Sequence, residues 1–533
     1  RIRNHPALAY YVASNESSEV SGTPELLKQL DGTRGYQMQS ECAGVHDGSP
    51  YKQVNPMQHY ENTASVRGSR VDGFNPEYGA PTLPTVEILR EMMDEKDLWP
   101  INKEVWDYLD GNGFHLMSTM YTDLVNNYGQ SSSIDEFAQK GQFVGAMNSK
   151  SIWEVWNYNK LDYGDRFCSG LLFWYHNCPV RQVCARMWDW SLEPTASLYH
   201  TANALEPLHA QFDYLKNTVS VVNDFYQEFK GYTVVAQVYD INSKKVFEES
   251  EKVDLPSDGV ANDVLAIRFP GDISQVHFIK LRLKDEKGKE VSSNFYWRSN
   301  DKYEGKETLT GPTSSGFETL SQLKKARLNT SYKTRKSEGK YFVDVTVKNV
   351  SGSIAFFNQL QFLNQDLKPI RPSFYTDNFF SLMPGESKSV VIETNAEKIT
   401  EEPVIVVKGW NRSEEHTSEL QTNKQMNTKV KTRTWVALLN LLFLFTAVNA
   451  QPVRQYLHEG WNFRQARGTN WYEATVPGTV HTDLMNNKLI DDPFYRLNER
   501  GVQWVDKEDW IYRTTFEVTP ELLAKKNIVL HFE

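Results

Sequence analysis

Cysteine is scarce in this sequence of 533 residues, which contains only four cysteines. None of them stands in a CxxC pair or beside a histidine at zinc-finger spacing, as the positions show: Cys42, Cys168, Cys178 and Cys184. This pattern argues against both a disulfide scaffold and a structural zinc site. We therefore expect no structural metal ion in this protein.

Basic residues are not in excess either. The 58 Lys and Arg residues against 68 Asp and Glu give a net charge of −10, and the acidic residues are dispersed along the chain. Because a nucleic-acid-binding protein presents a basic face, we expect no nucleic-acid partner.

Aromatic residues are abundant, with 14 Trp and 26 Tyr. This excess suits stacking on the flat faces of sugar rings, although large hydrophobic cores explain it equally well.

The apolar run from Trp435 to Val448 is too short for a membrane span, which needs about 20 apolar residues, and Asn440 interrupts it. Met426 and three cations precede the run, and Val-Asn-Ala ends it. This order is typical of a secretory signal peptide, so we assign residues 426–450 to one. A buried core helix would leave the basic flank unexplained. We therefore expect a secreted or periplasmic location and no membrane span in the mature protein.

A signal peptide inside a chain suggests that two sequences have been joined. Residues 412–421 read RSEEHTSELQ, which looks like the translation of a sequencing-library adapter, although a solvated linker would have a similar composition. We interpret residues 412–425 as an adapter-like linker. It joins residues 1–411 to the beginning of a second secreted protein, residues 426–533. The length alone predicts several domains.

Residues 1–215 alternate short apolar runs with amphipathic stretches, which indicates strand and helix units. The apolar runs end in polar or acidic residues, as strands do at the catalytic mouth of a (β/α)₈ barrel. We predict that 1–215 is the C-terminal half of a TIM barrel, strands 4 to 8. The expected strands are Leu8–Ser14, Gly73–Asn75 and Ser169–Trp174, and the expected helices are Leu83–Met93 and Ile134–Asn157.

After residue 215 the apolar residues alternate with a period of two, which indicates antiparallel sandwiches. We predict two Ig-like β-sandwiches, residues 216–305 and 317–411, and a truncated jelly-roll-like β-sandwich, residues 451–533, whose short strands are separated by Pro-Gly turns. The expected strands of the two Ig-like units are Thr233–Tyr239, Phe278–Leu283, Val291–Trp297, Tyr341–Asn349, Phe356–Phe362, Lys388–Glu393 and Pro403–Trp410.

Two carboxylates, Glu16 and Glu77, each follow an apolar strand of the predicted barrel. A barrel would turn both strand ends towards one mouth. A protonated carboxyl there can donate to the leaving oxygen of a glycoside while an ionised one attacks the anomeric carbon, and a separation of about 5–5.5 Å would make the reaction retaining. The alternative is that both are merely solvated acidic residues at strand ends.

Local motifs around these carboxylates resemble those of glycoside hydrolase family 2. Residues 3–6 read RNHP and are followed by a strand and Asn15-Glu16, and residues 74–79 read FNPEYG. The resemblance implies that Glu16 is the general acid/base, that Glu77 is the nucleophile at the end of barrel strand 7, and that Asn15 binds the sugar 2-hydroxyl. It also implies that Tyr51 hydrogen-bonds the nucleophile and that Trp174 stacks on the sugar. A turn-flanking aromatic and a core tryptophan are the alternatives for these last two.

The resemblance extends over nearly all of residues 1–411, through Ser131–Asn157, Phe173–Asn177, Ala204–Gln211, Val291–Trp297 and Asp377–Glu386. The tail of two sandwiches is most similar to the branch of exo-β-glucosaminidases, endo-β-mannosidases and β-mannosidases. Residues 178–186 depart from the N-x-x-W-P pattern of that branch, which leaves the identity of the sugar open. Residues 451–533 resemble the leading sugar-binding domain of a second family 2 β-mannosidase.

The expected function is therefore that of a retaining β-glycoside hydrolase that acts on β-mannoside or β-glucosaminide linkages of oligosaccharides or glycans, without a metal or nucleotide cofactor. The alternative is a non-catalytic carbohydrate-binding or adhesion protein with a decayed barrel. Barrel strands 1 to 3 are not in the sequence as given, and a half barrel cannot close. We therefore expect this chain by itself to fold poorly and to show little activity.

Overall fold

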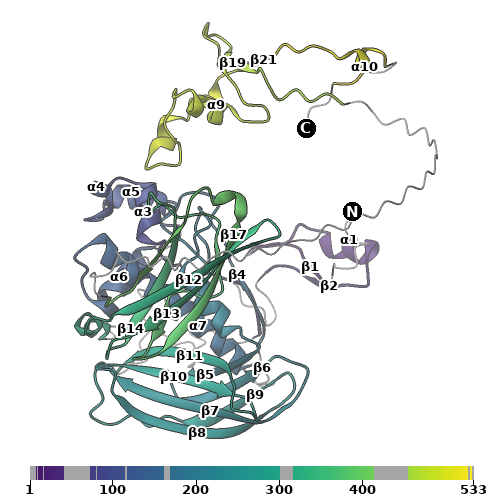
Figure 1. Ribbon diagram of the computed structural model, residues 1–533. Coiled ribbons are helices and arrows are strands. Elements are labelled where there is room, and N and C mark those ends of the chain that lie inside the picture. The colour runs from purple at the N-terminus through teal and green to yellow at the C-terminus, as the bar shows by residue number, and fades with distance from the viewer. Residues whose placement is uncertain are drawn as a thin grey trace, which may run out of the picture. The chain divides into compact units, whose positions relative to one another are not determined.

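The computed structural model describes residues 8, 10–15, 17–40, 73–79, 81–114, 117–160, 168–300, 316–412, 454–525 and 528–530. The chain forms two compact units, Arg1–Ser418 and Glu419–Glu533, which are taken in turn (Figure 1). The RNHP motif, the signal peptide predicted at 426–450 and nearly all of the linker predicted at 412–425 lie outside the described residues.

The first unit opens with two pairs of parallel strands. Strand β1 (Tyr10–Val12) pairs with β2 (Gly35–Gln37), with helix α1 (Thr23–Leu30) between them in the chain, and β3 (Gly73–Tyr78) pairs with β4 (Cys168–Phe173). Parallel strands joined by helical crossovers are the repeating unit of α/β folds. The three strand predictions in this region are confirmed. Within the described residues the two pairs belong to separate sheets, so the barrel stays a prediction.

Helices fill the chain between β3 and the first sandwich. The predicted helix Ile134–Asn157 is confirmed as α7 (Ile134–Tyr158), where the Ser133 hydroxyl caps the first turn. The helix predicted from Leu83 is α3 (Val86–Met92), and it begins later because Pro84 disfavours a helical conformation at the residue before it. No helix that the structure describes is both long and apolar enough to cross a membrane. The other helices are α4 (Glu95–Leu98), α5 (Lys103–Leu109), α6 (Met117–Tyr128) and α8 (Ala196–Ala204).

The first Ig-like sandwich has two antiparallel sheets, with strand orders β11-β10-β7-β8 and β5-β6-β9. The strands predicted around residues 233–239, 278–283 and 291–297 are confirmed. Strand β5 precedes residue 216 but belongs to this sandwich, because it pairs with β6 along its whole length and adds Ala210 and Phe212 to the core. The strands are β5 (Leu208–Asp213), β6 (Thr218–Asn223), β7 (Phe229–Asp240), β8 (Lys245–Leu255), β9 (Gly259–Ala266), β10 (Val276–Lys284) and β11 (Glu290–Ser299).

The second Ig-like sandwich pairs its strands in the orders β12-β13-β17-β15 and β16-β14-β18. Val343, Val345 and Val347 alternate with more exposed residues along β13 and enter the core, which is the pattern that predicted the strand. All four strand predictions are confirmed. The elements are η1 (Phe317–Gln322), β12 (Leu328–Ser337), β13 (Lys340–Asn349), β14 (Ala355–Leu363), β15 (Phe374–Tyr375), β16 (Phe380–Leu382), β17 (Ser387–Asn395), η2 (Ala396–Lys398) and β18 (Val404–Lys408).

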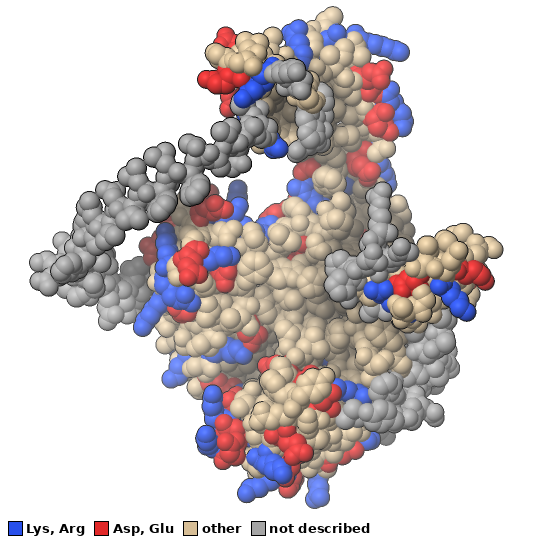
Figure 2. Space-filling view, turned by 90° about the vertical axis from the view of Figure 1, so that its right-hand side faces the viewer, with Lys and Arg blue, Asp and Glu red and all other residues tan. Residues whose placement is uncertain are grey.

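The second unit has a small core of Phe463, Leu484, Val502 and Val505 beneath an antiparallel sheet of order β20-β19-β21. The jelly-roll predicted for 451–533 stays a prediction. The elements are β19 (Asn462–Gln465), β20 (Tyr472–Glu473), α9 (Val480–Asn486), η3 (Asn498–Gly501), η4 (Val505–Lys507), β21 (Trp510–Arg513) and α10 (Pro520–Leu523). Figure 2 shows that acidic and basic side chains are interspersed over the described part of the face in view.

Candidate active site

The carboxyl end of β3 carries Glu77, the predicted nucleophile, which is half-buried. Asn75 is buried, and its side-chain Oδ1 accepts a hydrogen bond of 2.9 Å from the backbone N–H of Glu77. Such a local bond fixes the backbone over two residues. Pro76 between them adds a restricted φ angle. The backbone that presents the Glu77 carboxylate is therefore held by its own segment.

The end of β4 brings Trp174 beside this segment. Tyr78 lies opposite Phe173 in the β3–β4 register, and the backbone N–H of Trp174 donates to the Tyr78 carbonyl at 2.5 Å. A Cβ atom at Gly79 would lie 2.0 Å from the carbonyl oxygen of Trp174, so only glycine permits this approach. The structure thus brings two of the predicted site residues, Glu77 and Trp174, to the same end of one pair of strands.

Arg186 braces both strand ends, and sequence reasoning gave it no role. Its side chain is 1% exposed and donates to the carbonyl of Gly79. The guanidinium lies 5.4 Å from the ring centroid of Trp174 and 5.3 Å from that of Tyr175, which is within cation–π range. The sequence signals Arg186 only by its place in residues 178–186, the segment that departs from the family pattern.

A second group that sequence reasoning missed is Asp110, which follows α5 and is buried. Burial raises the pKa of Asp110 to about 7, with a further contribution from Asp107, while the Met117 N–H and the charge of Arg186 oppose the rise. No motif surrounds this residue in the sequence. A carboxyl group that titrates near neutral pH therefore lies within electrostatic reach of Arg186.

The described structure does not test the positions of the remaining predicted residues relative to Glu77. Asn15 is exposed and follows β1, which belongs to the other strand pair. Glu16 and Tyr51 lie outside the described residues, so their roles and the separation of the Glu16 and Glu77 carboxyls stay predictions. Among the described residues, no three His, Cys, Asp or Glu side chains are grouped to hold a metal ion.

Family models match three parts of the chain. Residues 216–303 match a mannosidase Ig/CBM-like domain, and residues 308–412 match an exo-β-D-glucosaminidase Ig-fold domain. Residues 461–533 match a glycosyl hydrolase 2 galactose-binding domain-like model. The class that fold and comparisons define is therefore a β-rich multidomain protein with Ig-like domains of the glycosyl hydrolase 2 type.

The chain is similar in sequence to two curated relatives and similar in fold to one solved structure. The chain is 26% identical over 393 residues to an exo-β-D-glucosaminidase of Amycolatopsis orientalis, covering 69% of this chain and 37% of the relative. It is 23% identical over 523 residues to a mannosylglycoprotein endo-β-mannosidase of Lilium longiflorum, covering 79% of this chain and 53% of the relative. The crystal structure of the Amycolatopsis orientalis exo-chitosanase CsxA shares the fold with a TM-score of 0.70 at 22% identity, covering 77% of this chain and 51% of that chain.

Parts of the chain thus match domain models of the glycosyl hydrolase 2 type, and the chain is similar to relatives named as an exo-β-D-glucosaminidase and an endo-β-mannosidase. It spans about half the length of these relatives or less.

Proposed function

We propose that residues 1–411 act as part of a retaining β-glycoside hydrolase on β-mannoside or β-glucosaminide linkages. The observation that carries the proposal is the position of Glu77 at the carboxyl end of β3, with Trp174 directly after the paired parallel strand β4. This is the end of a parallel strand at which α/β barrels place their chemistry. The names of the relatives support both classes of linkage.

In the proposed mechanism the Glu77 carboxylate attacks the anomeric carbon while the protonated Glu16 carboxyl gives its proton to the leaving oxygen. The glycosyl group is then esterified to Glu77. Glu16, now ionised, takes a proton from water, and the water oxygen displaces Glu77 from the sugar and regenerates both groups. Asn15 binds the 2-hydroxyl of a mannoside, or the 2-amino group in its place in a glucosaminide, Tyr51 hydrogen-bonds Glu77, and the ring of Trp174 stacks on the sugar. These steps require neither a metal ion nor a cofactor.

The proposal extends to the finer architecture and the location. Residues 1–215 supply barrel strands 4 to 8, and residues 451–533 form part of a jelly-roll-like sandwich. Residues 426–450 are a signal peptide, which implies a secreted or periplasmic protein. The linker 412–425 joins two sequences of separate origin. The division into units Arg1–Ser418 and Glu419–Glu533 supports this last point.

The test is hydrolysis of aryl β-mannosides and aryl β-glucosaminides by residues 1–411 placed in a complete eight-strand barrel. We expect Glu77→Ala to lower kcat at least about 10³-fold for every substrate, because the nucleophile is lost. We expect Glu16→Ala to retain turnover of substrates whose leaving group needs no protonation. Equal loss in both variants for activated and unactivated substrates would contradict these roles.

A second candidate function, non-catalytic carbohydrate binding, is favoured by one observation. The matched models are described as CBM-like and galactose-binding domain-like, which are names of binding rather than catalytic domains. Binding of glycans without hydrolysis would support it. So would a Glu16–Glu77 carboxyl separation well beyond about 10 Å in the folded barrel, since both retaining and inverting hydrolysis need shorter distances.

A further inference from the structure

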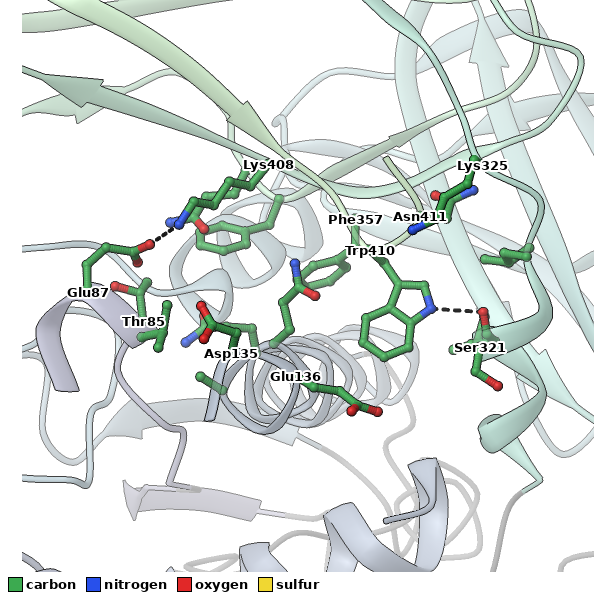
Figure 3. Close-up of a pocket in the computed structure, with 18 residues that line it drawn as sticks. Thr85, Glu87, Asp135, Glu136, Ser321, Lys325, Phe357, Lys408, Trp410 and Asn411 are labelled. Atoms are coloured by element: carbon green, nitrogen blue, oxygen red, sulfur yellow. Dashed lines mark hydrogen bonds and ion pairs between the residues drawn. The ribbon is translucent and has the colours of Figure 1, made fainter. Parts of the chain in front are cut away.

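A cavity of about 360 Å³ opens where the first turns of α3 and α7 meet the second sandwich (Figure 3). Its volume falls within the range of about 300–1,000 Å³ that is typical of small-molecule sites. Neither Glu77 nor Trp174 is among the residues that line it. The cavity therefore lies outside the candidate active site, and nothing in the proposed hydrolysis uses it.

Trp410 supplies an aromatic wall of the cavity. Its indole N–H already donates to the carbonyl of Leu320 at 2.8 Å, and its ring centroid lies 5.2 Å from that of Phe143 in an edge contact. These contacts fix the ring and satisfy its polar group. Lys140 Nζ also lies over the ring, 6.0 Å from its centroid, so the half-buried indole offers a ligand only the ring surface that this ammonium leaves uncovered, which suits the C–H face of a sugar.

The carboxylates of the cavity are neutralised by neighbouring cations. Glu87 is paired with Lys408, as Figure 3 shows, Asp135 lies 2.8 Å from Arg90, and Glu136 lies 2.7 Å from Lys140. These pairs leave no unpaired carboxylate to attract a cation, whereas Lys325, which also lines the cavity, has no carboxylate partner among the described residues. A paired carboxylate still has further lone-pair sites, and these can accept hydrogen bonds from hydroxyl groups.

Two amide side chains complete the polar lining. Gln139 of α7 and Gln359 of β14 both line the cavity and are half-buried. Neither side chain has a hydrogen-bond partner within the part of the chain that the structure describes. Each amide offers two N–H donors and a carbonyl acceptor, which is the combination that a sugar's hydroxyl groups use.

We propose that this cavity is a second, non-catalytic carbohydrate site that holds one or two neutral sugar residues. The sugar ring stacks on Trp410, and its hydroxyls bond to Gln139, Gln359 and the carboxylate of Asp135. The site goes beyond the proposed hydrolysis and does not depend on Glu77. It would hold a glycan chain to the protein at a point remote from the cleaved bond.

The experiment is a titration of the full chain with β-1,4-linked mannotriose, in which calorimetry and saturation-transfer NMR measure the binding. We expect Trp410→Ala to weaken binding at least about tenfold, because the stacking surface is lost. The double variant Gln139→Ala/Gln359→Ala should also weaken it several-fold, and it decides the question if Trp410→Ala does not fold. The matched control is Gln365→Ala, on the same sandwich but outside the cavity, where the amide bonds the Glu402 carbonyl at 2.6 Å. It should bind like the parent chain.

Three outcomes would overturn the proposal. One is the absence of binding, and another is binding that neither cavity variant weakens. The third is displacement of mannotriose by inorganic phosphate, which would indicate an anion site at Lys408. Loss of binding in Glu77→Ala alone would place the sugar in the candidate active site, and so would reject the second site without touching the proposed hydrolysis. Conversely, a chain that hydrolyses nothing but binds mannotriose through Trp410 retains the second site.

Discussion

At the scale of single residues, the candidate site depends on close packing between two strand ends. Asn75 holds the backbone of Glu77, and Gly79 lets the Trp174 carbonyl approach where any side chain would collide with it. The Arg186 guanidinium packs against the Trp174 and Tyr175 rings within cation–π range. The position of the carboxylate thus depends on neighbours that do no chemistry themselves.

Gly79→Ala tests this packing. The added Cβ would lie 2.0 Å from the Trp174 oxygen, so the β3 and β4 ends must separate, and we expect a loss of about 1–3 kcal/mol in the free energy of unfolding. Urea unfolding followed by tryptophan fluorescence measures the loss. The matched control is Gly271→Ala, where an added Cβ would meet no atom within 4 Å. Equal stability of the two variants would contradict the packing described for the site.

Sequence patterns pointed to the residues proposed to be chemically active more readily than to the residues that pack around them. Glu77 and Trp174 were predicted because they stand in short motifs at the ends of apolar runs. Arg186 and Asp110 were missed, because their importance comes from burial and from contacts across the fold that no local spacing records. A lone charged residue between apolar neighbours gives the same signal whether it is buried or exposed.

At the scale of elements, a buried polar cluster ties α7 to the first sandwich. Glu154 of α7 accepts hydrogen bonds from the Tyr296 hydroxyl at 2.7 Å and the Asn294 amide at 2.9 Å, and lies 3.0 Å from Nε2 of His209. Lys150, one turn earlier, bonds to the side chain of Asn294 and the carbonyl of Phe295. The segment 204–211, which resembled the glycosidase family, therefore serves to dock a helix.

This cluster predicts a pH-dependent stability. Burial lowers the pKa of His209, but its hydrogen bonds with Glu154 and Glu206 outweigh burial and raise it above the ordinary value. A raised pKa means that charged His209 stabilises the fold fully below about pH 6.5 and that this contribution disappears as the pH rises through the folded-state pKa. We expect His209→Gln to cost about 3 kcal/mol of unfolding free energy at pH 6 and less at pH 9.

His200 provides the control for that measurement. Burial, with a contribution from the charge of Lys150, lowers the pKa of His200 to about 3, so this imidazole stays neutral from pH 5 upward. The cost of His200→Gln should therefore be slightly larger at pH 9 than at pH 6, opposite in direction to that of His209→Gln, because only unfolded His200 binds a proton near pH 6. A cost of His209→Gln that does not fall between pH 6 and pH 9 would contradict the predicted pH dependence.

The elements themselves were mostly predictable from periodicity. The alternation along β7, β10 and β13 marked them as half-buried strands, and the apolar repeat at helical spacing marked α7. Strand β5 was not separated from the barrel region, although its sequence LHAQFD alternates apolar and polar residues; nearly all of its residues, the polar ones included, are buried. Which strands share a sheet depends on long-range pairing that no local pattern encodes.

At the scale of the whole molecule, the chain is two units with separate cores. Among the described residues, the first unit has one extensive cluster that joins β3, α7 and β4 to the first sandwich and another in the second sandwich. The cluster described in the second unit is small and consists of Phe463, Leu484, Val502 and Val505. Small cores give marginal stability, because less apolar surface is buried per residue. The boundary between the units falls within the linker that the sequence predicted at 412–425.

We expect the two units to unfold independently, with Glu419–Glu533 unfolding first. Calorimetry of the full chain should equal the sum of separate measurements on Arg1–Ser418 and Glu419–Glu533, because each unit has its own core. A single cooperative transition in the full chain, or a shift in the unfolding temperature of either unit after separation, would contradict this independence.

The central claim is that Glu77 is the nucleophile of a retaining glycosidase. The most direct test is to incubate residues 1–411, within a complete eight-strand barrel, with a 2-deoxy-2-fluoro-β-mannosyl fluoride and to map the trapped ester by mass spectrometry. The enzyme forms a glycosyl ester with such a sugar but hydrolyses this ester slowly, so the ester accumulates. If Glu77 is the nucleophile, we expect one fluorosugar on the peptide that contains Glu77. A label on another carboxylate, or turnover of aryl glycosides with inversion of the anomeric configuration, would contradict it.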